Sequence, residues 1–557
     1  MVMAGGNVPS STLGLPVKSL VLVAMMVSSP VSSRTPDGLV VVSRHGVRRQ
    51  FPSSTHDFAK FAPGKTFATE DKDWGVDGSM GVLTRHGYDA AHLMGRFQGQ
   101  KYSHDGLPLE SCSDMFVYCE EDMPRDEFTA EAFFKGFIEG WGTAGGDPRV
   151  GSCAVPKPHF EEVEYLIDQG SKPRGDSGQC RLGSEEEVQG VVGKVDEWTR
   201  LLRSKLQKLN EVLGCCDRSL CPAGHPADQP CTLMDMPHVW DEEHWYVTFT
   251  GPVYAGKYFS EWFLLNYLNG MEVAWGNLTE EDVMDLAAFV TEYRHFEFDL
   301  LAARPFGSAL LMHIVATLDQ MEAGINLKAV AHDPNVKLVY YAAHDTNLLY
   351  IAELLDLKWV SEGWQPNHTP PGGELVLEAY IVDDELNVAA FFDIATPSQI
   401  RELTDLTPSN PPGRVAITIP GCSQGEELLC PLSKLRALAI RSVDSECITP
   451  PELVEYVSEL WAKDPVVLQA KPMMGGDPIK SAADTAPNVG QLLVGLVMGV
   501  VVSSLAVFGC RSKVGGSSGV PRSANGRASV AKTGTGGLRN RGGRDDDDLE
   551  LLQSGRR

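Results

Sequence analysis

The chain has 557 residues and carries 74 Asp and Glu against 48 Lys and Arg, a formal net charge of −26. Nucleic-acid binding needs a basic face, so this balance argues against a nucleic-acid-binding protein. An acidic protein that binds an anionic ligand must instead concentrate its positive charge in one place. About 460 residues lie between two terminal hydrophobic segments, more than one core usually needs, so we expect a core with a second lobe.

The first 33 residues have the pattern of a secretory signal peptide. Lys18 precedes a short apolar segment at 20–27, and the small residues Val31 and Ser33 offer a cleavage site before Arg34. This apolar segment is too short to span a bilayer. We therefore expect the rest of the chain to enter the secretory pathway, where disulfides form.

The second hydrophobic segment, residues 489–508, contains no charged residue and is long enough to cross a membrane. Arg511 and Lys513 follow directly, and basic residues mark the cytoplasmic end of a span. The pattern predicts a single-pass type I membrane protein whose folded part is lumenal or extracellular. Residues 466–488 would be a linker, and residues 509–557, rich in Gly, Ser and Arg, a disordered cytoplasmic tail.

The first motif with chemical character follows an unbroken apolar run, Leu39 to Val42, which is typical of a strand buried on both faces. The run ends at a polar turn that contains Arg44, His45 and Arg48. Ligands bind at the carboxyl ends of strands in open α/β sheets. The two arginines would repel each other unless an anion lay between them, and a tetrahedral phosphate can accept paired hydrogen bonds from each. The turn therefore predicts a phosphate site, although a basic surface turn would look similar.

Two further strands end in polar residues. Residues 114–119 read as a short strand, followed by Arg125 and a helical stretch at 129–137. Residues 336–343 form an apolar, β-branched and aromatic run that ends at His344 and Asp345. A lone His-Asp pair is usually a surface turn, but here three strands would deliver candidates to one edge of a sheet.

These motifs resemble those of the histidine acid phosphatases of the histidine phosphatase superfamily, branch 2, and in particular the bacterial phytase and glucose-phosphatase type. Residues 44–48 resemble the active-site motif, and His344-Asp345 resembles the second signature. Further matching segments are Gly81-Val82-Leu83-Thr84, Thr129 to Phe133, Glu261 to Leu265, Pro370 to Val376 and Asn410 to Gly413. The family's Arg-Thr is Arg125-Asp126 here, and an acid at that position could pair with Arg125 and weaken its hold on phosphate. Residues 49–52 also depart from the short Pro-Thr turn of the bacterial proteins.

The resemblance implies an α/β fold with a three-layer core, in which helices flank a mostly parallel central sheet, and an inserted helical cap lobe. Residues 34–160 and 336–465 would form the core, and residues 161–335 the lobe. Residues 185–335 contain 10 Lys or Arg against 24 Asp or Glu. A hexakisphosphate needs several cations around its outer phosphates, so this acidic lobe favours less charged phosphomonoesters.

The resemblance also implies a mechanism for hydrolysis of phosphomonoesters. His45 would attack phosphorus and become a phosphohistidine. The phosphate would be bound by Arg44, Arg48, Arg125 and His344. Asp345 would donate a proton to the leaving alcohol, so activity should fall as pH rises to neutral and above. The arginines would supply the positive charge, so we expect no metal and no cofactor.

Three alternatives remain open. A phytase-type inositol phosphate hydrolase has the same motifs. A non-catalytic receptor for phosphorylated ligands could keep the fold, although intact His45 and Asp345 argue against it. A phosphate-transferring mutase of the same superfamily would not need a signal peptide or an anchor.

The chain has 12 cysteines, of which 11 precede the second hydrophobic segment. The resemblance implies four bridges: Cys112 with Cys153, Cys180 with Cys447, Cys221 with Cys231, and Cys422 with Cys430. Cys119, Cys215 and Cys216 are left over. Adjacent cysteines rarely bridge each other, so a free thiol or a disulfide-linked dimer is expected from this remainder. Asn277 and Asn367 begin glycosylation sequons.

Overall fold

The computed structural model describes residues 34–50, 57–66, 81–121, 123–161, 163–167, 180, 183–240, 249–297 and 300–463. The expected signal peptide, linker, membrane segment and cytoplasmic tail lie outside these residues, as does Cys510.

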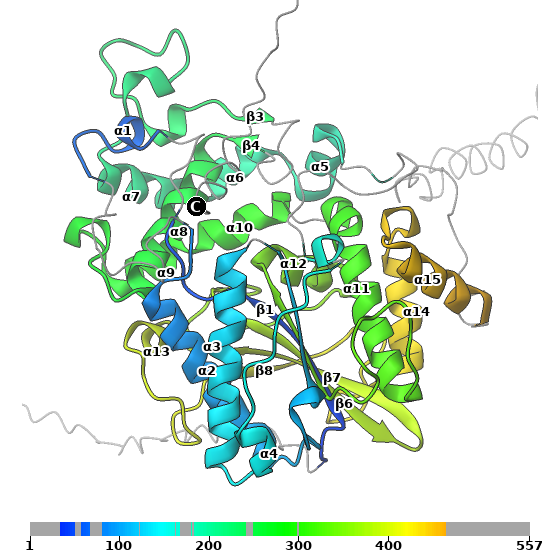
Figure 1. Cartoon of the computed structure of the whole chain (residues 1–557). Coiled ribbons are helices and arrows are strands. Elements are labelled where there is room, and N and C mark those ends of the chain that lie inside the picture. Colours follow the sequence, from blue (N-terminus) through cyan, green and yellow to red (C-terminus); the bar gives the residue numbers. More distant parts are fainter. Residues whose placement is uncertain are drawn as a thin grey trace, which may run out of the picture. The chain divides into compact units, whose positions relative to one another are not determined.

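A seven-stranded sheet runs through the described chain in the order β2-β5-β1-β6-β7-β8, with β9 paired to β7 (Figure 1). Its strands are β1 (Gly38–Arg44), β2 (Met115–Cys119), β5 (Leu338–Ala343), β6 (Glu374–Val382), β7 (Glu385–Ile394), β8 (Gly413–Ile417) and β9 (Cys430–Pro431). The pairs β2–β5 and β5–β1 are parallel, and the other pairs are antiparallel. The sheet is therefore mixed, and its parallel part consists of the three strands that the sequence pattern singled out.

Strand β1 lies at the centre of a three-layer arrangement. Val40 and Val42 belong to one hydrophobic core, whereas Leu39 and Val41 belong to another, because successive side chains of a strand point to opposite faces. All four side chains are 0% exposed. A strand covered on both faces has no place for polar side chains, which explains the unbroken apolar run. The α/β three-layer prediction is confirmed.

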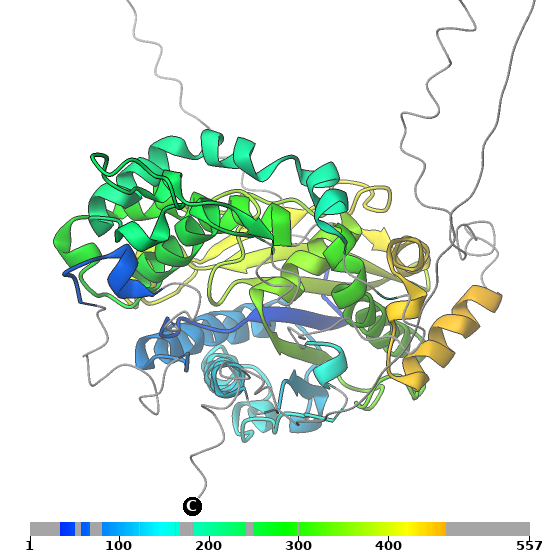
Figure 2. The ribbon, with the colours of Figure 1, turned by 90° about the horizontal axis from the view of Figure 1, so that it is seen from above.

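Helices cover both faces of the sheet, and Figure 2 shows the sheet between the two layers. Side chains of α2 (Arg85–His104) and α3 (Pro124–Thr143) pack in the core that contains Leu39 and Val41. On the other face lie α11 (Leu300–Ala323), α12 (Asp345–Leu355), α14 (Leu432–Ser442) and α15 (Pro451–Lys463). The short helices α4 (Pro148–Gly151) and α13 (Pro397–Arg401) complete this part of the chain.

The region from residue 183 to residue 297 is mostly helical where the structure describes it, as the sequence pattern predicts. Its helices are α5 (Glu185–Val192), α6 (Val195–Leu201), α7 (Arg203–Leu213), α8 (Pro252–Leu268), α9 (Glu280–Leu286) and α10 (Ala288–Glu297), and α1 (Phe58–Phe61) packs beside them (Figure 1). A two-stranded ribbon, β3 (Val239–Trp240) and β4 (Phe249–Thr250), joins them. Helix α11, which follows in the chain, packs against α12 and α14. The division of the chain at residues 161 and 335 stays a prediction.

One helix of the described part is long and apolar enough to cross a membrane, at Leu301–Ala323, but 89% of that segment is buried inside the protein. Its apolar surface is covered by the sheet and by α12 and α14, as in the core helix of a globular domain. The predicted membrane segment is a different one, residues 489–508, and lies outside the described residues.

The structure contains the four disulfides that the resemblance implies, Cys112–Cys153, Cys180–Cys447, Cys221–Cys231 and Cys422–Cys430. The expectation for the remaining cysteines was wrong in one respect, because Cys215 and Cys216 are bonded to each other. Among the described cysteines this leaves Cys119 as the free thiol, and it is 0% exposed. The described part therefore offers no accessible thiol for the disulfide-linked dimer that we expected.

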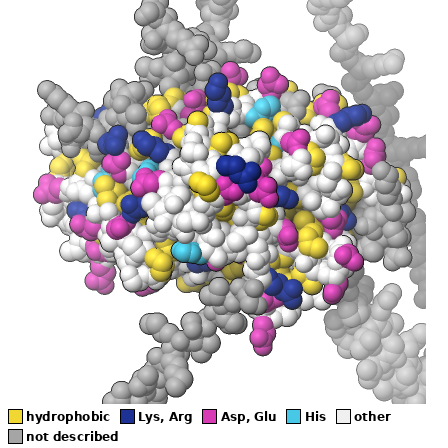
Figure 3. Space-filling model, turned by 60° about the horizontal axis from the view of Figure 1, so that its bottom comes forward, with side chains coloured by type: hydrophobic (Ala, Val, Ile, Leu, Met, Phe, Trp, Pro, Cys, Tyr) yellow, Lys and Arg dark blue, Asp and Glu magenta, His cyan; other side chains and the backbone are white. Residues whose placement is uncertain are grey.

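The distribution of charged side chains on the surface is consistent with the acidic composition of the chain. On the face shown in Figure 3, basic and acidic side chains are interspersed and no basic stripe is formed. Of the two sequons, Asn277 is exposed. Asn367 is half-buried, its Oδ1 accepts a hydrogen bond of 3.0 Å from the backbone N–H of Trp359, and Thr369 is 1% exposed. Only the Asn277 sequon is open to modification in the folded protein.

Candidate active site

The site is built where β1 and β5 end side by side. The backbone N–H of His45 donates a hydrogen bond of 2.9 Å to the carbonyl of Ala343, the last residue of β5. The carbonyl of His45 accepts a hydrogen bond of 3.0 Å from the N–H of Gly372. The turn that carries His45 is thus held between two neighbouring segments, and one of them belongs to the predicted motif at 370–376.

His45 is 3% exposed, and the contacts of its ring define its tautomer. Its Nδ1 lies 2.9 Å from the carbonyl oxygen of Gly46. A carbonyl oxygen can only accept, so Nδ1 carries the proton and Nε2 keeps a lone pair. Burial, followed by the positive charges of Arg125, Arg44 and Arg48, holds the pKa of His45 well below its usual value. The ring is therefore a neutral base with a free Nε2.

The start of α2, which follows the matching segment at residues 81–84, supports the His45 turn. The Oγ1 of Thr84 donates a hydrogen bond of 3.0 Å to the carbonyl of Val47 and caps α2 by accepting from the N–H of Gly87. A Cβ on Gly87 would lie 2.1 Å from the carbonyl oxygen of Val47. Glycine is needed there because the two backbones touch.

Arg44 and Arg48 share one carboxylate, and it comes from a distant helix. Arg44 donates to Oε1 of Glu261 at 3.0 Å, and the guanidinium of Arg48 lies 3.6 Å from the same oxygen. Arg44 also donates to the carbonyl of Thr369 at 2.7 Å. The anion that the two arginines were expected to need is therefore provided by α8 when no substrate is bound.

Glu261 is ionised. Burial by itself would raise its pKa, but Arg48, Arg44 and Lys257 lower it to about 2. The sequence analysis assigned no chemistry to Glu261, although a signal exists. It is the only acidic residue in α8, whose other side chains are almost all apolar and buried. A carboxylate in such a helix needs a cationic partner.

Arg125 and Asp126 begin α3 and face different neighbours. Arg125 is 9% exposed. Among the charged neighbours of His45, it lowers the pKa of that histidine the most. The carboxylate of Asp126 lies 3.2 Å from Nε2 of His344, and the charge of Arg125 also acts on it. The same nitrogen lies 2.8 Å from Oε2 of Glu120, the residue after β2. Sequence reasoning missed Glu120, although it follows the carboxyl end of a predicted strand.

Asp345 sits between two arginines. Its Oδ2 lies 2.9 Å from Arg44 and accepts a hydrogen bond from Arg294 of α10. Burial opposes ionisation, but the charges of Arg294 and Arg44 outweigh it and hold the pKa of Asp345 well below its usual value. Arg294 was also missed, because one arginine in a helix carries no sequence signal of its own.

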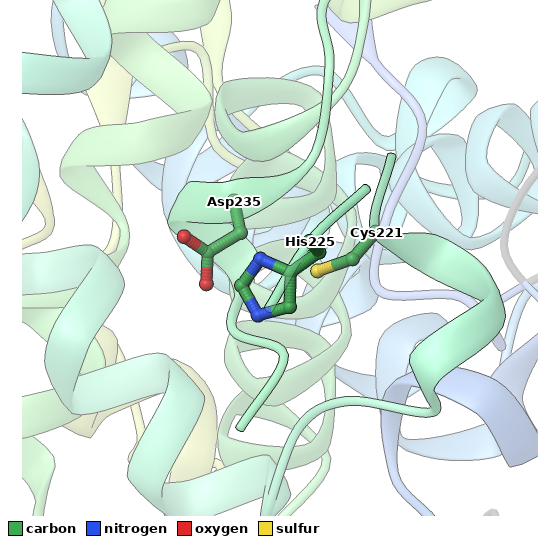
Figure 4. A group of neighbouring side chains, drawn as sticks. All are labelled: Cys221, His225 and Asp235. Carbon is green, nitrogen blue, oxygen red and sulfur yellow. The ribbon is translucent and has the colours of Figure 1, made fainter. Parts of the chain in front are cut away.

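Two groups of side chains in the described part have ligand atoms close enough together to hold a metal ion. One consists of Cys221, His225 and Asp235 (Figure 4). Cys221 is bonded to Cys231, so it offers no thiolate, and Asp235 accepts hydrogen bonds from Thr232. The other consists of Glu120, Asp126 and His344, in which Nε2 of His344 lies close to both carboxylates.

All six residues predicted from the sequence lie together at the carboxyl ends of the parallel strands. They are Arg44, His45, Arg48, Arg125, His344 and Asp345. The rings of His45 and His344 have centroids 5.8 Å apart in an edge-to-face arrangement. Three arginines, Arg44, Arg48 and Arg125, converge on one neutral histidine, which fits a site for a phosphoryl group.

Comparisons with known proteins address the family of this chain. The sequence model of the histidine phosphatase superfamily (branch 2) matches residues 37–392. Phytase AppA of Escherichia coli (strain K12) is 26% identical over 406 residues, which cover 70% of this chain and 87% of the relative. Glucose-1-phosphatase of Salmonella typhimurium (strain LT2) is 24% identical over 445 residues, which cover 75% and 97%.

Solved structures confirm the fold. Hafnia alvei phytase in complex with tartrate aligns with a TM-score of 0.61 at 25% identity and covers 75% of this chain and 100% of its own. The phytase from Citrobacter braakii aligns with a TM-score of 0.60 at 24% identity and the same coverage. The family match spans β1, β2 and β5 and more than half of the sequence. The chain therefore belongs to the histidine phosphatase superfamily, branch 2, and is a phosphatase that hydrolyses phosphate esters.

Proposed function

We propose that this protein is a membrane-anchored phosphomonoester hydrolase whose catalytic part is lumenal or extracellular, and that it works through a phosphohistidine at His45. The observation that carries the proposal is the free Nε2 of a neutral His45, surrounded by Arg44, Arg48 and Arg125. A neutral imidazole is the form that can attack phosphorus.

The reaction takes two displacements. Nε2 of His45 attacks phosphorus, the bond from phosphorus to the ester oxygen breaks, and the leaving alcohol takes a proton from Asp345. Water then attacks the phosphohistidine, Asp345 takes a proton from that water, and inorganic phosphate leaves with Nε2 restored. The charge on the transferring group is offset by Arg44, Arg48, Arg125 and His344.

Asp345 can donate a proton only in the complex with substrate, because the carboxyl is ionised in the free enzyme. A bound phosphate dianion competes for Arg44 and adds negative charge beside Asp345. Both effects raise the pKa of the carboxyl. The proposed mechanism therefore needs acid pH for proton uptake as the substrate binds, and activity should decline toward neutral pH.

The test is hydrolysis of p-nitrophenyl phosphate at about pH 5, in the presence of a chelator, by the full chain and by its His45→Ala variant. The exposed His104 provides a matched control, His104→Ala. We expect His45→Ala to lose roughly a thousand-fold or more of kcat and the control to keep full activity. A His45→Ala enzyme with a tenth of the activity or more would contradict the phosphohistidine.

A phytase-type activity on inositol phosphates is the second candidate, and it is favoured by the relatives named phytase. Against it stands the acidic composition of residues 185–335, with 24 Asp or Glu and 10 Lys or Arg. Comparing kcat/KM for glucose 1-phosphate and for inositol hexakisphosphate separates the two. We expect glucose 1-phosphate to be preferred. Turnover of neither ester, with inorganic phosphate still bound, would favour the receptor.

The anchor is proposed from residues 489–508 alone, an uncharged segment followed by Arg511 and Lys513. The test expresses the protein in a secreting cell and measures phosphatase activity in the membrane fraction and in the medium. We expect the full chain to stay with the membrane fraction after a carbonate wash, and a chain ending at residue 466 to be released into the medium. Release of the full chain would contradict the anchor.

A further inference from the structure

A second group of titratable side chains lies behind the phosphate-binding arginines, and two of its three members, Glu120 and Asp126, take no part in the two displacements. It consists of Glu120 at the end of β2, Asp126 on α3 and His344 at the start of α12. Nε2 of His344 lies 2.8 Å from Glu120 and 3.2 Å from Asp126. One nitrogen therefore faces two carboxylates, and at most one proton can bridge them.

The surroundings of Asp126 favour a bound proton. The residue is 0% exposed, and neither of its carboxylate oxygens accepts a hydrogen bond from the described residues. Its charged neighbours come from every element packed around it: Glu120 from β2, Arg125 and Glu127 from α3, and His344 from α12. Cys119 of β2 and Tyr340 of β5 are the neighbouring groups that stay neutral, since their pKa values are well above normal. Burial, opposed by His344 and Arg125, raises the pKa of Asp126 to about 7.

The charges of the whole site show why such a proton matters. Five cations, Arg44, Arg48, Arg125, Arg294 and Lys257, face five carboxylates, Glu120, Asp126, Glu127, Glu261 and Asp345. When all five carboxylates are ionised, these ten groups cancel. A tetrahedral dianion that enters then adds two negative charges to a buried region, which is costly unless protons enter with it.

We propose that phosphate binding is coupled to proton uptake by the Glu120–Asp126–His344 group, and that Asp126 is the positioning residue that retains this proton. The inference rests on the proposed function for the place where phosphate binds. Protonated Asp126 removes one negative charge next to His344, so an entering dianion meets less electrostatic repulsion there. The affinity for the dianion then falls as pH rises, by up to tenfold per pH unit for one coupled proton.

Sulfate is the probe, because it is a tetrahedral dianion that stays fully ionised at neutral pH and is not turned over. Sulfate binding to the full chain is measured by titration calorimetry at about pH 7 in two buffers with different ionisation enthalpies, which gives the number of protons taken up. We expect roughly half to one proton per sulfate for the wild type. Asp126→Asn should take up less than half of the wild-type number, and its sulfate affinity should vary less with pH.

Two further variants keep the result interpretable. Glu120 is partly exposed, so Glu120→Gln should fold, and it should also lower the proton uptake. Glu139→Gln changes an exposed carboxylate on the same helix and should leave the uptake unchanged.

Wild-type binding without proton uptake, or uptake that Asp126→Asn and Glu120→Gln both leave intact, would overturn the proposal. Absence of sulfate binding would overturn it as well. The calorimetry needs no turnover, so it can fail while the His45→Ala test of the proposed function succeeds, and the reverse also holds.

Discussion

The guanidinium of Arg44 lies 2.9 Å from the carboxylate of Asp345. Arg44 is the last residue of β1, and Asp345 follows the end of β5, which pairs with β1 in parallel. The first residue belongs to the proposed phosphate site and the second is the proposed proton donor. Their contact ties the ionisation of Asp345 to the occupancy of the phosphate site, because a bound dianion competes for Arg44. Substrate binding therefore changes the proton donor that it is about to use.

Arg294→Gln should move the pH dependence of catalysis. Arg294 is the first of the charges that lower the pKa of Asp345, so its loss lets that pKa rise. An acid with a higher pKa stays protonated to a higher pH, and the decline of kcat/KM should begin about one pH unit later than in the wild type. The measurement is a profile of kcat/KM against pH. Arg304→Gln is the control, because Arg304 donates a hydrogen bond to the carbonyl of Ser442 and not to Asp345. An unchanged profile would contradict the role of Arg294.

Asp345→Asn should discriminate between leaving groups. An amide cannot donate a proton to a departing alcohol, so hydrolysis of a sugar phosphate should fall by roughly a hundred-fold or more. p-Nitrophenolate leaves without a proton, so p-nitrophenyl phosphate should lose less than about ten-fold. Equal losses of kcat on both esters would remove Asp345 from the role of proton donor.

Glu261→Gln should tighten the binding of inorganic phosphate. Arg44 and Arg48 both lie within 3.6 Å of Oε1 of Glu261, and a neutral amide no longer competes with the anion for them. We expect the inhibition constant of phosphate at about pH 5 to fall by roughly three- to ten-fold. The control is Glu272→Gln, which changes an exposed carboxylate that follows the end of α8, the helix of Glu261. Weaker inhibition would mean that Glu261 organises the arginines rather than competing with phosphate.

Asp126→Asn should flatten the dependence of stability on pH. The pKa of Asp126 is raised from 3.8 to about 7 in the folded protein, so the folded state binds more protons than the unfolded state between these values. Stability is then lost as pH rises from about 4 to about 7, and the loss is absent when the carboxyl is replaced by an amide. Urea unfolding at about pH 5 and pH 7.5 gives the change in the free energy of unfolding between these pH values, for the wild type and for the variant. A wild type that gains stability relative to the variant over this range would contradict the raised pKa.

The cysteines predict a chain without disulfide-linked dimers. Cys215 and Cys216 bond to each other, and Cys119 is buried with a pKa well above normal. A chain that ends at residue 466 should run as a monomer on a non-reducing gel and should react with thiol reagents only after unfolding, at one site. A dimer band that disappears on reduction, or a thiol reactive in the native protein, would contradict this pairing.

The sequence by itself determined the α/β class and the six residues first expected in the site. Local patterns carried this information. Leu39 to Val42 are apolar because both faces of β1 are covered, and the polar motifs at Arg44 and His344 follow where covered strands end. Parallel strands bring their carboxyl ends to one edge, so the strand pattern alone is enough to join two motifs that lie about 300 residues apart.

Only the tertiary structure decided which charges face these residues. Glu261, Arg294 and Glu120 reach the site from α8, from α10 and from the end of β2, and no local pattern says which partner a helix will meet. The structure also decided that Asp126 faces His344, because the orientation of α3 at its first turn sets the direction of that side chain. Composition and strand ends fix where a charged site lies, whereas pKa values depend on distances that exist only after helices and sheet have packed.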